Sequence, residues 1–291
     1  MKNRRNITES IYNNALLIIL SLICLVPFLL VLSVSLTSES GINVSGYRLI
    51  PSDFSLEAYK YIFSNPDEVF SAYRVTILVT AIGTVCGTLI SAMLAYPLSR
   101  KDFKPGKVIS FCIYFTMLFS GGLVPTYLLV TKYLGLKDTM LALILPILLN
   151  AWNIFLLRTF FTSIPSALIE AASIEGANEF EIFFKIALPI GKVGVVIIAL
   201  FSVLNYWNDW FQSMLYIDRS NIQSLQYMLY RVMKKTNLSK EMGGAMIYSE
   251  KLPNENLRMA LCVVAAGPML FVFPFFQKYF TRGITVGSVK G

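Results

Sequence analysis

The chain has 291 residues, of which 55% are apolar and only 14% are charged, and its mean hydropathy is +0.62. These values exclude a soluble globular protein and indicate an integral membrane protein. The net charge of +8 requires no nucleic acid, because basic loops beside anionic lipid account for it. The absence of His removes the commonest general base and the commonest metal ligand.

Six apolar stretches approach the roughly 20 residues that an α-helix needs to cross a bilayer. They lie at about 15–36, 74–98, 108–130, 139–160, 192–215 and 258–277. We expect each of them to be a membrane-spanning helix and not a barrel strand. No internal repeat or low-complexity linker divides the chain, so residues 1–291 are predicted to form a single all-α transmembrane domain.

The first stretch follows Lys2, Arg4 and Arg5, as the core of a secretory signal peptide does. Its apolar run of about 22 residues exceeds the roughly 7–15 residues of such a core, so we expect it to be retained as a helix. Six spans place both termini on one side. The basic residues before the first span and at 100–107 indicate the cytoplasm, although the basic segment 216–257, about 40 residues long, then lies outside.

A polar segment, EAASIEGANEFEIFFKIALP at 170–189, follows the fourth stretch. Ser163 and Pro165 predict a helix start, and Gly176 predicts a left-handed cap. Asn178 and Glu181 predict a capping box for a second helix, which Pro189 ends. Residues 163–189 are therefore expected to form a helix, a tight turn and a helix.

This hairpin has two interpretations. It is either an amphipathic element on lipid headgroups or a docking site for another protein. In the second interpretation, small residues allow close approach and apolar residues anchor the partner; these are Ala171, Ala172 and Ala177, and Ile174, Phe180, Phe183 and Phe184.

The run NYWNDW at 205–210 places amides, a carboxylate and indole rings together at the end of the fifth stretch. Such groups suit stacking on sugar faces and hydrogen bonding to hydroxyls, and an ionised group at bilayer depth needs a cavity or a partner. A Trp and Tyr belt at the membrane interface explains the same run, and helix-to-helix hydrogen bonding explains Asn150 and Asn153. The candidates for a solute path are Asn153, Asn205, Trp207, Asn208, Asp209 and Trp210.

The hairpin residues EAA, the following glycine and the terminal LP resemble the cytoplasmic loop motif of permease subunits of binding-protein-dependent ABC importers. The flanks NAWNIFLLRTFFTSIPSALIEAA and FFQKYFTRGITVGSVKG resemble the carbohydrate type, related to the maltose and arabinose-oligomer importers. The resemblance implies a type I importer permease (MetI-like) fold with a cytoplasmic coupling-helix hairpin. Glu175 and Val193 depart from the family's usual aspartate and proline. The residues that would couple to a separate ATPase are Glu170, Ala171, Ala172, Glu175, Gly176, Ala177, Leu188 and Pro189.

The sequence has no His, no nucleophile or phosphate-loop motif and no paired carboxylates, so this chain is expected to catalyse nothing and to bind no cofactor or metal. The resemblance implies that ATP and Mg belong to two ATPase subunits. It also implies a second permease, in a heterodimer or a homodimer, an extracytoplasmic solute-binding protein and a bacterial cytoplasmic membrane. Residues 216–257 are either the docking surface for the solute-binding protein or a solvated cap over the helices. The solute is expected to be a sugar or oligosaccharide, and another small solute stays open. A membrane enzyme for lipid-linked sugars and a gradient-driven carrier are the other interpretations; paired carboxylates and inverted repeats, which they need, are not seen.

Overall fold

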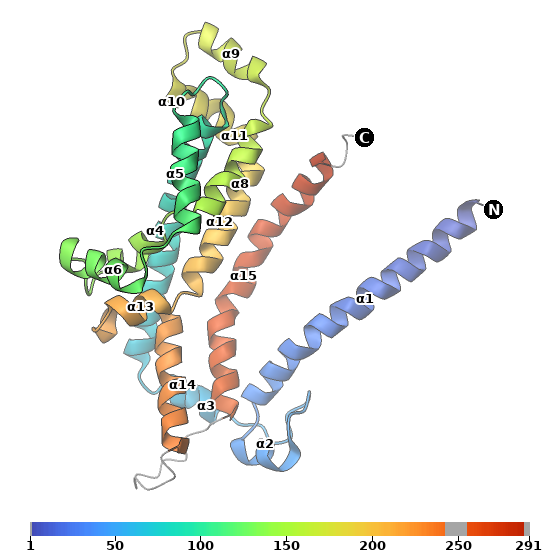
Figure 1. Ribbon diagram of the computed structural model, residues 1–291. Coiled ribbons are helices and arrows are strands. Elements are labelled where there is room, and N and C mark those ends of the chain that lie inside the picture. Colours follow the sequence, from blue (N-terminus) through green and yellow to red (C-terminus); the bar gives the residue numbers. More distant parts are fainter. Residues whose placement is uncertain (1, 242–254, 288–291) are drawn as a thin grey trace. The chain divides into compact units, whose positions relative to one another are not determined.

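The computed structural model describes residues 2–241 and 255–287, with side chains described for 12–234 and 255–277. Within these residues the chain is helical, as expected, and its extended pairing is limited to one bridge between Thr37 and Phe54. The elements in chain order (Figure 1) are α1 Lys2–Ser35, α2 Glu39–Ser45, α3 Glu57–Ile62, α4 Pro66–Ser99, α5 Gly106–Leu118, α6 Leu123–Leu128, η1 Leu129–Tyr133, α7 Met140–Ile144, η2 Leu145–Ile147, α8 Ala151–Thr162, α9 Ser166–Ile174, α10 Glu179–Ile182, η3 Phe183–Ala187, α11 Leu188–Ile190, α12 Lys192–Trp207, α13 Phe211–Tyr216, η4 Ser220–Ile222, α14 Leu225–Glu241 and α15 Glu255–Gly287.

Three described helices are long and apolar enough to cross a membrane unaided. They are Tyr12–Ser35 within α1, the whole of α4, and Glu255–Gln277 within α15. Three helix pairs qualify together but are bent: α5 with α6 and η1 by 112°, α7 and η2 with α8 by 56°, and α10 to α11 with α12 by 81°. If each bent pair is one span, the described chain has up to six spans, which is the number that the sequence predicts.

The structure corrects three of the predicted spans. The stretch 108–130 is not one straight helix, because Phe119 is extended and Gly122 adopts a φ of +89°, which turns the chain. The stretch 139–160 bends after a 3₁₀ turn that contains Pro146, whose nitrogen cannot donate a helical hydrogen bond. The stretch 192–215 is interrupted as well, since α12 ends at Trp207 and α13 begins at Phe211.

The chain divides into two compact units, and the division falls within α4, α14 and α15. The first unit comprises residues 1–69 and 231–269, and the second comprises 70–230 and 270–291. The prediction that residues 1–291 act as a single domain stays a prediction. In the first unit, Glu39 accepts hydrogen bonds from the backbone nitrogens of Glu255 and Asn256, at 3.0 and 3.4 Å, and so caps the amino end of α15.

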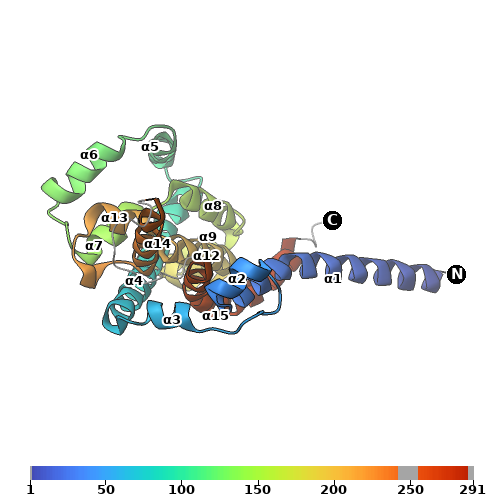
Figure 2. The ribbon, with the colours of Figure 1, turned by 90° about the horizontal axis from the view of Figure 1, so that it is seen from below.

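In the second unit, α4, α5, α8 and α12 form a bundle, and α9 lies at one end of it (Figure 1). Seen along this bundle, α6 projects to one side (Figure 2). Two glycines let α4 approach its neighbours closely. A Cβ on Gly83 would lie 2.3 Å from the ring of Tyr206, and one on Gly87 would lie 2.6 Å from the carbonyl oxygen of Leu148.

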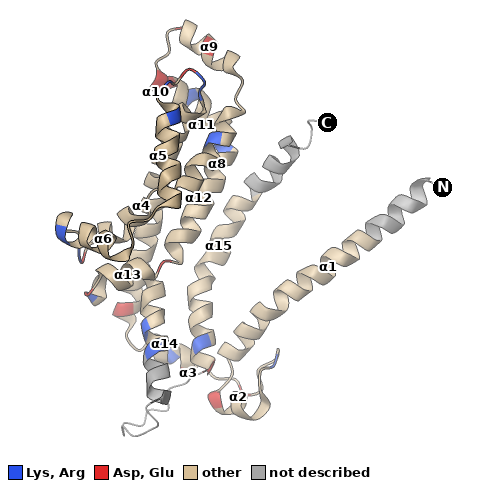
Figure 3. Cartoon of the chain, in the orientation of Figure 1, with Lys and Arg blue, Asp and Glu red and all other residues tan. Residues whose placement is uncertain are grey.

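Charged residues of the second unit gather toward its two ends, and the middle of the bundle is free of them (Figure 3). The sequence has no Asp, Glu, Lys or Arg over 75–99, 108–131, 139–157 and 193–208. Such charge-free helical runs match the hydrocarbon core of a bilayer, in which ionised groups are costly. The middle of the bundle is therefore the part of this unit that fits the membrane interior.

Candidate functional site

The first helix of the hairpin, α9, ends in a Schellman motif. Gly176 has a φ of +88°, its nitrogen donates to the carbonyl of Ser173, and the nitrogen of Ala177 donates to the carbonyl of Ala172 at 3.0 Å. The predicted left-handed cap is therefore confirmed. The predicted start at Ser163 is wrong, because Ser163 belongs to the end of α8 and its Oγ donates to the carbonyl of Phe160.

The second helix begins with the predicted capping box. Asn178 Oδ1 accepts from the nitrogen of Glu181 at 2.9 Å, and Glu181 Oε2 accepts from the nitrogen of Asn178 at 3.2 Å. Lys185 donates to the other Glu181 oxygen, and these hydrogen bonds, the one from Lys185 foremost, lower the pKa of Glu181. After α10 the chain makes the π-helical turn η3, and α11 ends at Ile190, one residue beyond Pro189.

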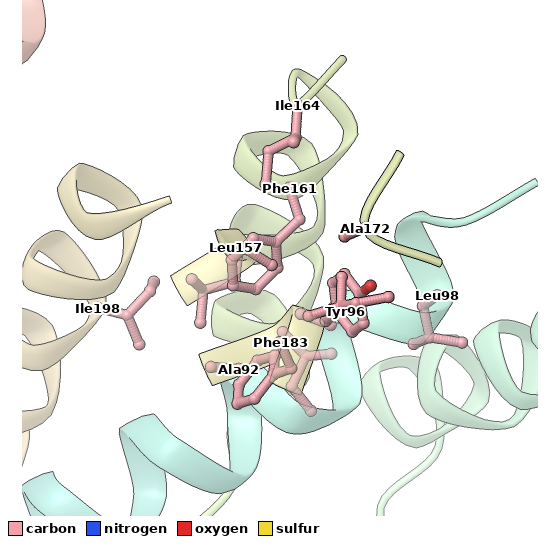
Figure 4. Packing of buried hydrophobic residues seen from close by; sticks show 13 residues of the cluster. Ala92, Tyr96, Leu98, Leu157, Phe161, Ile164, Ala172, Phe183 and Ile198 are labelled. Atoms are coloured by element: carbon pink, nitrogen blue, oxygen red, sulfur yellow. The ribbon is translucent and has the colours of Figure 1, made fainter. Parts of the chain in front are cut away.

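One side of the hairpin is buried in an apolar cluster (Figure 4). There Ala172, Ile182, Phe183 and Ala187 pack with residues of α4, α8 and α12, among them Tyr96, Phe161 and Ile198. The ring centroids of Tyr96 and Phe183 are 5.5 Å apart, and those of Tyr96 and Phe161 are 6.1 Å apart. The packing of these side chains fixes the hairpin to the bundle.

The opposite side of the hairpin is exposed. Ile174 is 87% exposed and Phe180 is 67% exposed, although both are apolar. Of the residues predicted to contact a partner, five are exposed, namely Glu170, Ala171, Glu175, Gly176 and Pro189. The other three face the bundle in part or in full: Ala172 is buried, and Ala177 and Leu188 are half-buried in the apolar cluster. The predicted anchor Phe183 is also buried. Ala172 and Phe183 therefore attach the hairpin to the bundle and do not form its outer surface.

Arg100, the first residue after α4, links that helix to the hairpin. Its Nη1 donates to both carboxylate oxygens of Glu179, the first residue of α10, each at 3.1 Å. Its Nε donates to Asp102 at 2.9 Å, and Nη1 also lies 3.3 Å from the hydroxyl of Tyr96, which donates to Glu179 at 3.4 Å. The Arg100 guanidinium holds the pKa of Asp102 below its usual range, and the hydrogen bond to Asp102 raises the pKa of Arg100.

A cavity of about 240 Å³ lies between α8 and α12 and brings two of the predicted solute-path residues together. Asn153 of α8 and Asn205 of α12 both line it, with Ile147, Leu148, Asn150, Phe201, Ser202 and Tyr206. Asn150 Oδ1 accepts from the backbone nitrogens of Trp152 and Asn153 and so caps α8. Across the described residues, the side-chain amides of Asn153 and Asn205 have no hydrogen-bond partner within the chain.

The other four predicted path residues do not line this cavity. The side chain of Trp207 is buried, and that of Asn208 donates back to the carbonyl of Leu204 at 2.8 Å. The carboxylate of Asp209 accepts from the nitrogen of Gln212 at 3.3 Å and caps α13. Trp210 stacks on Tyr230 with ring centroids 4.8 Å apart. The break in the predicted fifth span accounts for Asn208, Asp209 and Trp210, because α12 ends at Trp207.

Residues 87–286 match the family described as binding-protein-dependent transport system inner membrane components, and this region is more than half of the chain. The chain belongs to this family. The permease is also 40% identical to the polygalacturonan/rhamnogalacturonan transport system permease protein YtcP of Bacillus subtilis, over 94% of this chain and 96% of that protein. It is 28% identical to the arabinooligosaccharides transport system permease protein AraQ of Halalkalibacterium halodurans, over 94% and 93% of the two chains.

A solved structure supports the same assignment. The permease superposes on a chain of a bacterial ABC transporter involved in the import of the acidic polysaccharide alginate, with a TM-score of 0.78 and 30% identity, over 95% of this chain and 98% of that chain. The predicted membership of the permease family and the predicted all-α importer permease fold are therefore confirmed. The permease is a membrane component of an ABC transporter.

Sequence reasoning missed two contributors to these sites. Ser202 lies three residues before Asn205, as Asn150 lies three before Asn153, and residues so spaced share one face of a helix. That repeated spacing of polar residues could have identified Ser202. Arg100 was considered only as one of several basic residues, and no pattern in the sequence of the permease links it to Glu179.

Proposed function

We propose that the permease is the transmembrane subunit of an ATP-driven importer of a sugar or oligosaccharide, and that its hairpin docks with a separate ATPase subunit. The observation that carries the proposal is the exposed side of α9. On α9, Ile174 is 87% exposed and Leu168 is 46% exposed, and Phe180 on the adjoining α10 is 67% exposed. Several exposed apolar side chains on one short hairpin that is fixed to a buried cluster fit a surface that another protein covers.

The charge of the hairpin argues against the lipid interpretation. Between Arg158 and Lys185 the sequence has no Lys or Arg, while it has four glutamates, Glu170, Glu175, Glu179 and Glu181. Helices that lie on membranes favour Lys and Arg on their polar face, because lipid headgroups are often anionic. A protein partner therefore suits this acidic hairpin better than a lipid surface does.

In this proposal the ATPase supplies the site of ATP hydrolysis, with its Mg, and the permease holds neither. Glu170, Ala171, Glu175 and Gly176 lie on the exposed side, where the ATPase would contact them. The hairpin is then cytoplasmic, which places both termini in the cytoplasm if all six spans cross the membrane. Type I importers of this family pair two permeases with two ATPase subunits and a solute-binding protein, and we propose the same assembly here.

The cavity between α8 and α12 supports a hydroxyl-rich solute. Asn153 and Asn205 each offer both a donor and an acceptor, which match the hydroxyl groups of a sugar. The cavity, at about 240 Å³, is smaller than the roughly 300–1,000 Å³ of most ligand sites. We therefore propose that the second permease completes the site. The named substrates of the relatives, polygalacturonan, rhamnogalacturonan and arabinooligosaccharides, support a carbohydrate.

The solute-binding protein would approach from the side opposite the hairpin. We place its docking surface at residues 216–257, of which 242–254 lie outside the described residues. Within the described part, α14 carries the exposed ring of Tyr230, which stacks on Trp210.

The test is affinity purification of the permease from its native membrane in mild detergent, followed by mass spectrometry. We expect wild type to recover a second permease and an ATPase, and Ile174→Asp to lose at least about tenfold of the ATPase, because a buried unpaired charge is costly. Val44→Asp is the matched control, since Val44 is 88% exposed on α2. Recovery of no ATPase with wild type would refute the proposal, and equal recovery with Ile174→Asp would refute the docking surface.

A further inference from the structure

The contact between Arg100 and Glu179 reaches the hairpin from a distant part of the chain. Of the described side-chain hydrogen bonds that end on residues 166–189, those from Arg100 and Tyr96 to Glu179 come from before α8. The hairpin otherwise reaches the bundle through apolar packing and through its own chain, by way of α8 and α12. Arg100 therefore adds a third connection, to the end of α4.

The geometry of this contact is more restrictive than that of an ordinary surface ion pair. The Arg100 side chain is only 18% exposed, and it is held on its other edge by Asp102. Tyr96, beneath it, is 5% exposed and packs against Phe161 and Phe183. An arginine fixed on several sides has a defined orientation, whereas two long exposed side chains lose most of their attraction to conformational entropy.

The other end of this connection is the solute cavity. From Arg100, α4 runs back through Gly87 and Gly83, where its backbone lies against Leu148 and Tyr206. Both of these residues line the cavity that contains Asn153 and Asn205. Because a Cβ at either glycine would clash, α4 cannot move toward these two walls without displacing them. A tilt or shift of α4 toward Leu148 and Tyr206 therefore acts directly on the cavity.

We propose that Arg100 is a positioning residue that makes α4 a third lever of the importer: it ties the start of α10 to α4, and α4 carries the motion of the hairpin to the Leu148 and Tyr206 walls of the solute cavity. This inference rests on the proposed function, because the hairpin moves only if an ATPase engages it. It predicts that loss of the contact separates ATP binding from changes at the cavity while the ATPase stays bound.

The experiment measures the exposure of the cavity in the reconstituted importer. The four native cysteines, Cys24, Cys86, Cys112 and Cys262, are replaced by serine, and Ser202→Cys introduces a thiol into the cavity wall. The alkylation rate of this thiol is then compared with and without ATP. The variants are Arg100→Gln, Glu179→Gln and the two combined. Lys185→Gln is the matched control, because the Lys185 side chain is 73% exposed and pairs with Glu181 inside the same hairpin.

We expect the ATP-dependent change in alkylation rate to fall at least about threefold in each single variant, with no further fall in the double variant, because both remove one contact. The Lys185→Gln variant should behave as the parent does. The ATPase should co-purify in full with all of them. A role limited to folding would instead lower the melting temperature and the amount of assembled importer without changing the response to ATP.

Two other results would count against the proposal, and they are distinguishable. If the single variants respond to ATP as the parent does, or if the double variant shows the product of the two single effects, the Arg100 lever is refuted and the docking of the ATPase is untouched. If no ATPase co-purifies and the parent does not respond to ATP, the proposed function fails and the lever fails with it.

Discussion

The hairpin and the cavity between α8 and α12 leave opposite kinds of side chain without a partner in this chain: apolar side chains at the hairpin and amides at the cavity. The hairpin buries its inner side in a tight aromatic and aliphatic cluster and leaves apolar side chains such as Ile174 outside. The cavity is instead lined by the amides of Asn153, which is half-buried, and Asn205, which is exposed, and neither amide has a partner among the described residues. Apolar groups without cover and amides without partners are both unfavourable in an isolated chain. Both regions therefore fit the proposal that another molecule completes them, an ATPase subunit at the hairpin and a solute in the cavity.

Replacement of both cavity amides, those of Asn153 and Asn205, should have the largest effect, because it should impair the cavity and leave the hairpin intact. We expect Asn153→Leu combined with Asn205→Leu to lower solute uptake at least about tenfold, because each lost hydrogen bond to a solute hydroxyl costs roughly 1 kcal/mol or more. The measurement is uptake of the labelled solute in cells, with recovery of the ATPase as a check on assembly. Asn208→Leu is the control, since its amide bonds to its own helix. Unchanged uptake in the double variant would remove these amides from the solute path.

The rigidity of the packing between α12 and α8, the helices that flank the hairpin, can be tested at Gly194. A Cβ on Gly194 would lie 2.5 Å from the ring of Phe160, so Gly194→Val forces the two helices apart. We expect a loss of about 1–3 kcal/mol in the free energy of unfolding, seen as a lower melting temperature in detergent. The double variant with Phe160→Ala should recover part of it. A Gly194→Val protein with the wild-type melting temperature would show that α8 and α12 can separate at this point without a loss of stability.

The turn of the hairpin allows a finer test. Gly176 has open space around it, so a substitution there acts through its φ of +88° and not through a clash within the chain. Gly176→Val should destabilise the turn by about 1–2 kcal/mol, and Gly176→Asn by less, because Asn tolerates the left-handed region. The two variants should lose coupled ATP hydrolysis in that order. Equal losses would mean that contact with the partner, and not the turn, decides the effect.

The smallest effect is expected at the loop that precedes α7. Hydrogen bonds from the backbone nitrogens of Asp218, at 2.7 Å, and Arg219, at 3.1 Å, lower the pKa of Asp138. A lowered pKa in the folded state gives stability that is complete above the unfolded value, about 3.9, and is lost as the pH falls through the folded value. Amide hydrogen exchange at Asp218 and Arg219 should therefore quicken, relative to other loops, only below about pH 4. Asp138→Asn should abolish this pH dependence.

The sequence predicted the local chemistry of the hairpin better than the course of the spans. The capping box of Asn178 and Glu181 and the left-handed Gly176 depend on residues a few positions apart, so their pattern is visible in the sequence. The break at Phe119 to Gly122 contains Ser120, Gly121 and Gly122, which are turn-forming residues inside a stretch that is apolar on average. Hydropathy measures whether a run can reside in lipid and does not measure its direction, so the 112° bend could not be predicted from it.

For a similar reason, the sequence could not show which of the candidate path residues line the cavity. Asn153 and Asn205 share a cavity because two helices 52 residues apart in the chain pack side by side, whereas Asp209 lies just past the end of its helix. Asp209 was a candidate because an ionised group inside the predicted fifth span would need a cavity or a partner, but α12 ends at Trp207, before Asp209. The contact of Arg100 with Glu179 spans a comparable separation and was invisible for the same reason.

The π-helical turn η3 between α10 and α11 has a consequence for the direction of motion. A π turn holds one residue more than an α-helical turn, and each α-helical residue advances the chain by about 100° around the axis. The residues after η3 are therefore rotated against those before it, out of phase with an uninterrupted helix. If the hairpin docks with an ATPase as proposed, the rotation at η3 sets the direction in which the hairpin moves α12. Deletion of one residue from η3 would turn the residues after it by about 100° relative to α10, and would so change that direction while leaving the exposed side of α9 unchanged.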